Sequence, residues 1–317
     1  MSRYQQIDIN AVKTYSIKER KSKVQIESLA SPFGTGGSLA NFLKTLPDIL
    51  KAKDFHRLVE KIVDSHQKQK PVIVMMGAHV IKVGLSPLLI DAMEKGLVTA
   101  LAVNGACAIH DTEMAYWGQT SEDVGEGLKD GSFGMAKETG EILNYTISRA
   151  KNSSKGFGEI LGERILAESP PYVDFSLLAS GIKSRVPVTV HVAIGTDIVH
   201  QQPNADGAAI GALSYNDFKI FAHQVGQLGD GGVVLAFGSA VVMPEVFLKA
   251  LTVARNIGCQ AHRFTTATFD MYHHYRPHVN IVQRPNMTGG EGFEFIGHHE
   301  IMIPLLFAAV KEKLNFS

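Results

Sequence analysis

The stretch that decides the fold is residues 71–96, PVIVMMGAHVIKVGLSPLLIDAMEKG. Its residues 72–76 are wholly apolar, which is typical of a strand that is covered on both faces. Ser86-Pro87 then predicts the start of a helix, because a serine cap and a first-turn proline both favour helix entry. Gly96 predicts the end of that helix, and residues 97–103 have the pattern of a second buried strand. Together these segments predict a βαβ unit of a parallel sheet.

The rest of the chain predicts an α/β fold, a mostly parallel sheet with helices on both faces that is Rossmann-like. Further strand signals occur at residues 188–194, 233–237 and 259–265. Helical patterns occupy residues 121–169 with a break at 152–156, and residues 216–228, 244–255 and 301–314. Residues 1–70 form a largely helical lead-in, helical from residue 41 to residue 69. We expect one domain over residues 1–317.

The amino-acid composition limits the kinds of molecule that the protein is expected to bind. The 317 residues are 45% hydrophobic with zero formal net charge, which gives no electrostatic reason to expect nucleic acid or a membrane surface as the partner. The first ten residues are polar, and the apolar stretch 231–248 is interrupted by glycines and by polar residues, so we expect a cytoplasmic protein with a small-molecule substrate. The two cysteines, Cys107 and Cys259, form no metal or redox motif, and Cys107 is more consistent with a buried thiol than with a nucleophile.

Polar side chains gather in the loops that follow the expected strands. Ligands of open parallel sheets bind beyond the carboxyl ends of the strands, so these side chains should converge at one edge. The loops are residues 77–84, 104–113, 195–211, 238–245 and 265–276. Their titratable members are His79, Lys82, His110, Asp111, Glu113, Asp197, His200, Asp206, Asp270, His273, His274 and Arg276.

Two kinds of site are compatible with these loops. Carboxylates and glycine amides could hold a dinucleotide, or imidazoles and carboxylates could hold a metal ion. The spacings His110 to Glu113 and His273 to His278 permit metal ligation, but the sequence has no HExxH motif. It also lacks the P-loop, the GxSxG elbow and GxGxxG, which argues against a P-loop nucleotidase, an α/β-hydrolase and an ordinary Rossmann dehydrogenase.

At these same loops the chain resembles the deoxyhypusine synthase family. GAHVIKVG at 77–84 resembles the family's TSNLISSG cofactor loop, NGACAIHD at 104–111 its TAGGVEED stretch, and FTTATFD at 264–270 its NTAQEFD segment. Residues 232–242, Asp206-Gly207, Arg276-Pro277 and residues 303–310 also match the order of the family's motifs. The resemblance implies an NAD-dependent transferase that acts on spermidine, with cofactor sites at the subunit interfaces of a homotetramer.

Two departures bear on the reaction. The family's imine-forming lysine follows the Arg-Pro pair in a WGK motif, whereas residues 278–287 of this chain read HVNIVQRPNM and contain no lysine. Met243, Pro244 and Glu245 stand where the family has its active-site histidine. Without an amine nucleophile the enzyme cannot form that imine, so we expect that the protein does not make deoxyhypusine.

The favoured hypothesis is an NAD-binding enzyme that acts on a small molecule bearing an amine or hydroxyl group. In this hypothesis His110, His79 and Lys82 have catalytic roles, and Glu113, Asp270 and His274 contact the substrate. It implies cofactor contacts for Gly77, Gly105, Asp111, Asp206, Gly238 and Thr265, and no bound metal. One alternative is a metal-dependent hydrolase or lyase that uses His110, Asp111, Glu113, His200 and His274. A non-catalytic nucleotide-binding homologue is the other alternative.

Overall fold

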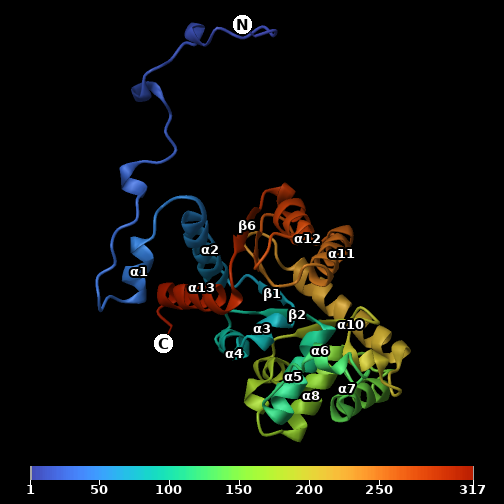
Figure 1. Cartoon of the computed structure of the whole chain (residues 1–317). Helices are drawn as coiled ribbons and strands as arrows, with labels where there is room; N and C mark the ends of the chain where they lie inside the picture. The colour runs from blue at the N-terminus through green and yellow to red at the C-terminus, as the bar shows by residue number, and fades with distance from the viewer. Residues whose placement is uncertain (1, 317) are drawn as a thin grey trace. The chain divides into compact units, whose positions relative to one another are not determined.

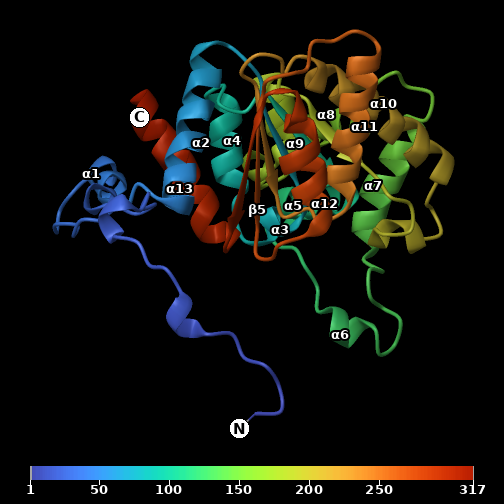
Figure 2. The ribbon, with the colours of Figure 1, turned by 90° about the horizontal axis from the view of Figure 1, so that it is seen from above.

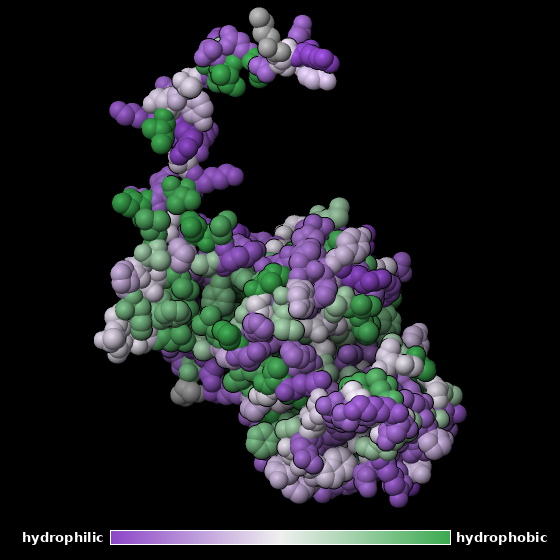
Figure 3. Space-filling view, viewed as in Figure 1, coloured by the Kyte–Doolittle hydropathy of each residue, from purple (hydrophilic) through white to green (hydrophobic). Residues whose placement is uncertain are grey.

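The structure is a computed structural model that describes residues 2–316 (Figure 1). It divides into two units, Met1–Lys53 and Asp54–Ser317. The first unit holds the short 3-10 helices η1 (Ile9–Ala11), η2 (Ile17–Glu19) and η3 (Ile26–Ser28), then α1 (Leu39–Thr45) and the start of α2 (Leu50–Gln67). Many apolar side chains of this unit are exposed, among them Ile7, Ile9 and Ile17 (Figure 3). The single domain expected over residues 1–317 stays a prediction.

The second unit is built on a six-stranded, all-parallel sheet with the strand order β3-β2-β1-β4-β5-β6. The strands are β1 (Val72–Met76), β2 (Ala100–Asn104), β3 (Val188–His191), β4 (Val233–Phe237), β5 (Thr265–Asp270) and β6 (Glu291–Ile296). The order reverses between β1 and β4, as in the Rossmann fold. The predicted α/β, Rossmann-like fold is thereby confirmed.

Helices cover both faces of this sheet. The connections contain α3 (His79–Lys82), α4 (Ser86–Glu94), α5 (Gly105–Trp117), α6 (Val124–Gly127), α7 (Lys137–Arg149), α8 (Phe157–Glu168), η4 (Val173–Phe175), α9 (Leu177–Ser184), η5 (Ile198–Gln201), α10 (Gly207–Gly226), α11 (Val242–Asn256), α12 (Tyr275–Pro277), η6 (His278–Gln283), η7 (Arg284–Thr288) and α13 (His299–Leu314). Figure 2 shows α4 and α13 on one side of the sheet and α10 and α11 on the other. No helix within residues 2–316 is long and apolar enough to cross a membrane.

Alternate residues of the central strands pack into the two halves of the core, one on each face of the sheet. Ile73 and Met75 of β1 point toward the layer of α10 and α11, where they cluster with Phe221 and Phe247. Val74 and its neighbours on β1 are equally buried, so all five residues of β1 are covered. Burial on both faces explains why the strand is continuously apolar instead of alternating.

A buried carboxylate ties α10 to the edge of the sheet. Asp217 is only 1% exposed, and its Oδ2 atom accepts hydrogen bonds from the backbone N–H groups of Gly158 (2.9 Å) and Val190 (2.7 Å). Burial raises the pKa of Asp217 to about 7, against the lowering effect of these hydrogen bonds. The side chain therefore joins α10, the first turn of α8 and β3.

The structure corrects three parts of the predicted element map. The strand expected at residues 259–265 corresponds to β5, which begins only at residue 265. The sequence pattern missed most of β5 because its threonines look polar, although the stretch is buried. Strand β6 was not predicted, since its glycine and two glutamates weaken the apolar pattern of an edge strand. Residues 104–113 are not a loop: the Asn104 side chain accepts a hydrogen bond from the Cys107 N–H and caps α5, which follows β2 directly.

Candidate active site

A cavity of about 580 Å³ lies at the carboxyl ends of β1, β2 and β3. Its wall is formed by α3, by α5, by the loop after β3 and by residues 118–136, a segment that carries α6 and that we call the excursion. Figure 2 shows the excursion extending away from the ends of α5 and α7. Polar and aromatic groups line the cavity, among them Lys82, His110, Glu113, Trp117, Thr120, Phe133, Thr139 and Asp197. The volume suits a small-molecule ligand.

A chain of hydrogen bonds in this cavity fixes the orientation of His110. Thr120 donates its hydroxyl proton to Glu113 Oε2, and Thr139 donates to Glu113 Oε1 at 3.0 Å. Because the Thr120 proton is committed to Glu113, the 2.6 Å contact between Thr120 Oγ1 and His110 Nδ1 requires the imidazole to donate. The proton therefore resides on Nδ1, and Nε2 keeps a lone pair that can accept a proton.

The cavity also shifts the pKa values of two of its groups in opposite directions. Burial, reinforced by the nearby Lys82 ammonium, lowers the pKa of His110 to about 4, so the imidazole is neutral near pH 7. Burial raises the pKa of Asp197 to about 6. A base and an acid with pKa values displaced from their usual ranges are typical of catalytic sites.

Removing the positive charge of Lys82 tests this electrostatic arrangement. In Lys82→Met the repulsion between the ammonium and the imidazolium is lost, so the pKa of His110 should rise from about 4 toward its usual value. NMR titration of the imidazole signals measures this shift, and Lys129→Met, which changes an exposed lysine on the excursion, is the matched control. An unchanged His110 titration in Lys82→Met would contradict the arrangement.

Asp197 lies against the first turn of α5. A Cβ atom on Gly105 would be 1.9 Å from Asp197 Oδ2, so glycine is required there to admit the carboxylate. The positive end of the helix dipole favours a negative group at this place. His200 orients the same loop, since its Nδ1 atom accepts from the N–H groups of Gly195 (3.1 Å) and Asp197 (3.2 Å). Gly105 thus accommodates a protein carboxylate at the start of α5.

Gly77 and Gly238 meet where the strand order reverses. They follow β1 and β4, and a Cβ atom on Gly77 would lie 2.3 Å from the Gly238 carbonyl oxygen. Gly238 also has a φ of +59°, which favours glycine, and its missing side chain leaves room for the ring of His299. His79, in the turn after Gly77, lies with its ring 5.6 Å from that of His299. These residues lie at the switch point of the sheet, outside the lining of the cavity that contains His110.

The structure places three of the predicted cofactor residues away from the crevice. Asp111 is 2% exposed and caps α9, accepting from Ser176 Oγ (2.6 Å), Leu177 N (2.6 Å) and Leu178 N (3.2 Å). Asp206 caps α10 by accepting from the N–H groups of residues 208 and 209. Thr265 is the first residue of β5 and therefore lies at the amino edge of the sheet, opposite to the crevice. These three residues therefore lie outside the proposed site.

The remaining predicted residues lie beyond the other half of the sheet. Asp270 ends β5, and its Oδ1 atom is 3.7 Å from His274 Nε2. Neither lines the cavity that contains His110, so the five histidines and carboxylates of the metal hypothesis are not gathered at one place. Cys107 is buried, and burial raises the pKa of its thiol, which disfavours a thiolate nucleophile.

Several residues of the cavity were not singled out from the sequence. Thr120 and Thr139 hold Glu113, and Trp117 and Phe133 provide aromatic wall. Hydroxyl and aromatic residues on a long connection carry no distinctive spacing, so the pattern offered no signal for them. Asp197 was recognised only as one polar member of its loop.

Comparison with known proteins supports the fold. The sequence matches no family model and no curated protein. A LOR/SDH protein from Methanococcus maripaludis S2 has a TM-score of 0.51 at 15% identity, over 84% of this chain and 71% of that one. AgrE, solved as a ternary complex with ornithine and NAD+, has a TM-score of 0.52 at 14% identity, over 86% of this chain and 35% of that one.

A deoxyhypusine synthase structure from Entamoeba histolytica has a TM-score of only 0.48 at 9% identity, over 88% of this chain and 95% of that one. The chain spans about a third of the length of AgrE. The LOR/SDH and AgrE similarities show a related fold, and no comparison shows membership of the deoxyhypusine synthase family.

Proposed function

We propose that this chain is an NAD-dependent enzyme that acts on a small molecule bearing an amine or a hydroxyl group. The observation that carries the proposal is the neutral His110, oriented through Thr120 by Glu113, in a cavity at the carboxyl edge of a sheet with Rossmann strand order. Sheets of this order bind dinucleotides at the reversal point. The fold neighbour AgrE, crystallised with ornithine and NAD+, agrees with such a cofactor and an amine substrate.

The groups present fit the chemical parts of the dinucleotide. Lys82 offers an ammonium for a phosphate, Asp197 a carboxylate for ribose hydroxyls, and Trp117 a flat apolar surface for a ring. In the proposal, Gly77 and Gly238 form the floor over which the cofactor lies. NAD would supply a hydride acceptor.

The side chains of this protein would handle the proton. His110 Nε2 would accept the proton from the amine or hydroxyl of the substrate, while Glu113 and Thr120 hold the ring in the required tautomer. Glu113 acts through Thr120 and is a positioning residue. His79, next to Gly77, remains a second candidate for proton transfer at the switch point.

Calorimetric titration with NAD+ tests the cofactor, and NAD+ reduction monitored by absorbance with ornithine, arginine and spermidine tests the reaction. His110→Gln should retain NAD+ binding and lose turnover by at least about 100-fold, the lower end of the usual contribution of a general base. His298→Gln, a change to an exposed histidine outside the cavity, is the control. Failure of the parent to bind NAD+ would refute the proposal, and binding without turnover of any substrate would favour the non-catalytic alternative.

We further expect that the protein does not make deoxyhypusine, because residues 278–287 form η6 and part of η7 without an amine side chain. Borohydride trapping with spermidine and NAD+ in the same assay should label no lysine. The homotetramer and the cytoplasmic location stay predictions, and light scattering would decide the first.

A further inference from the structure

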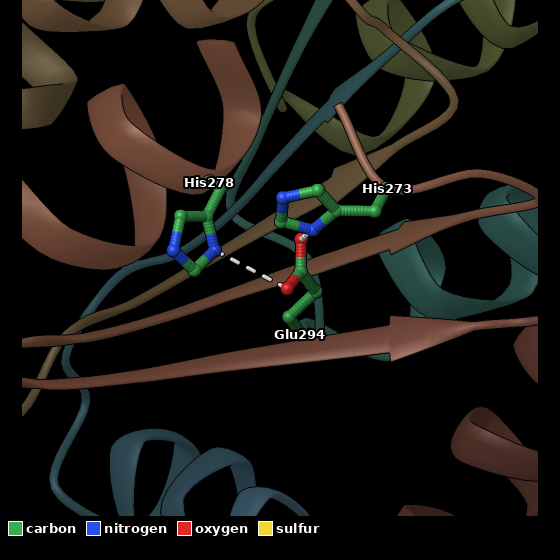
Figure 4. Close-up of side chains that lie close together, drawn as sticks. All are labelled: His273, His278 and Glu294. Atoms are coloured by element: carbon green, nitrogen blue, oxygen red, sulfur yellow. Dashed lines mark hydrogen bonds and ion pairs between the residues drawn. The ribbon is translucent and has the colours of Figure 1, made fainter. Parts of the chain in front are cut away.

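Two histidines and a glutamate converge on the outer half of the sheet (Figure 4). His273 follows β5, His278 is the first residue of η6, and Glu294 lies on the edge strand β6. His273 Nδ1 is 2.9 Å from Glu294 Oε1, and His278 Nδ1 is 3.2 Å from Glu294 Oε2. One ligand atom from each of the three side chains lies within 4.8 Å of the others. Figure 4 shows both rings turned toward the carboxylate.

The backbone that presents His278 is unusual. Residues His278–Gln283 form a π-helix, a rare conformation that is frequently found at functional sites. It places Gln283 so that its Nε2 atom is 2.8 Å from His278 Nε2. A polar partner on the second nitrogen is the arrangement that orients metal-binding histidines.

We propose that His273, His278 and Glu294 bind a divalent transition-metal ion of the Zn²⁺ type. Two imidazoles and one carboxylate are a ligand set that catalytic zinc sites use, with a fourth position left for water. Ligand atoms around a tetrahedral zinc ion are about 3.3 Å apart, and here one ligand atom from each of the three side chains lies within 4.8 Å of the other two. Only small side-chain movements are needed to admit the ion.

Binding changes the tautomer of His278 without changing its charge. Its Nδ1 atom ligates the ion, and its proton then resides on Nε2. That N–H donates to the carbonyl oxygen of the Gln283 side chain once the amide rotates, since the amide orientation follows the hydrogen-bond network. Gln283 is therefore a positioning residue for the metal ligand.

None of the three ligands lines the cavity that contains His110, and the two histidines also lie outside the small cavity that Glu294 shares with Gly238. Their side chains are 58%, 30% and 20% exposed, in the order His273, His278 and Glu294, so an ion can reach them from solvent. The inference thus goes beyond the proposed function and can fail independently of it.

Titration of the full, untagged and chelator-treated chain with ZnCl₂ in a calorimeter tests the site. The parent should bind one equivalent, and His273→Ala, His278→Ala or Glu294→Gln should each weaken binding by more than about 100-fold, since even outer-shell changes cost 10- to 100-fold. The matched control is His298→Ala, which removes an exposed histidine 3.8 Å from Glu300 and should leave zinc affinity unchanged. Visible absorption of the Co²⁺ form should show the same ranking.

Gln283→Ala supplies a finer test, because it retains all three ligands and should weaken zinc binding by about 10- to 100-fold. Circular dichroism of each metal-free variant establishes that the exposed substitutions leave the fold intact. Absence of saturable zinc binding by the parent would overturn the proposal, as would parent-like affinity in folded His278→Ala. NAD+ titrations of His273→Ala and His278→Ala, whose side chains line neither cavity, should match the parent.

Discussion

Asp111→Ala is expected to lower the free energy of unfolding by about 3–6 kcal/mol. Asp111 accepts three hydrogen bonds at the start of α9, from Ser176, Leu177 and Leu178. Alanine would leave the two backbone N–H groups buried without an acceptor, at about 1–3 kcal/mol each, and would remove the bond to the serine hydroxyl as well. Guanidinium denaturation followed by circular dichroism measures the loss.

Asp206→Ala provides the matched control for this experiment. Asp206 also caps a helix, but its side chain is 31% exposed and water can replace it at the freed N–H groups. Loss of such an exposed N-cap should therefore cost much less stability than loss of the buried Asp111. Equal losses in the two variants, or a fully stable Asp111→Ala protein with impaired NAD+ binding, would contradict a structural role for Asp111.

Asp217→Ala is expected to cost about 2–6 kcal/mol, because it leaves the buried N–H groups of Gly158 and Val190 unpaired. Asp217→Asn should be milder, since one amide oxygen can still accept both bonds. Denaturant titrations of both variants and the parent provide the comparison. A loss below 1 kcal/mol in Asp217→Ala would show that these groups find other partners.

The same carboxyl group predicts a dependence of stability on pH. Its folded pKa of about 7 lies above the ordinary value of 3.8, so the native state binds the proton more tightly than the unfolded state. The resulting stabilisation is fully present below about pH 4 and is lost as the pH rises through 7. Asp217→Asn removes this contribution, so the fall in stability between pH 5 and pH 8 should be smaller than in the parent. An equal loss of stability in the parent and in Asp217→Asn would show that another group binds the proton.

The sequence was most predictive where local chemistry and burial agree. The predicted strand 233–237 coincides with β4, and the end of α4 at Gly96 is confirmed by a φ of +66°. Strand β5 was placed too early because threonines 265, 266 and 268 look polar, although their β-branched side chains suit a buried strand. The hydrophobic pattern alone could not predict β6, because this strand is defined by its parallel pairing with β5.

The sequence predicted part of the candidate site and missed the rest. Lys82, His110 and Glu113 were among the polar residues expected to converge at the carboxyl edge of the sheet, and all three line one cavity there. Residue type and loop position could not reveal that Asp111, next to His110, points to α9 instead, because successive residues on a helix face in different directions. His273 and His278 were noted as permissible ligands, but Glu294 belongs to the unpredicted strand, so the complete set emerged only from the fold.

The contact between Gly77 and Gly238 has a mechanical consequence. Any side chain at residue 77 would strike the carbonyl oxygen of residue 238, and the Gly77 N–H donates to the Phe237 carbonyl oxygen at 3.0 Å, so the exits of β1 and β4 are in direct backbone contact. Substitution of Gly77 should therefore require a backbone shift at this point of the sheet. The excursion, in contrast, is a surface connection, and away from Thr120, which holds His110, exchanges on it should leave the sheet undisturbed. Evolution or engineering of a new specificity would therefore begin with residues 118–136.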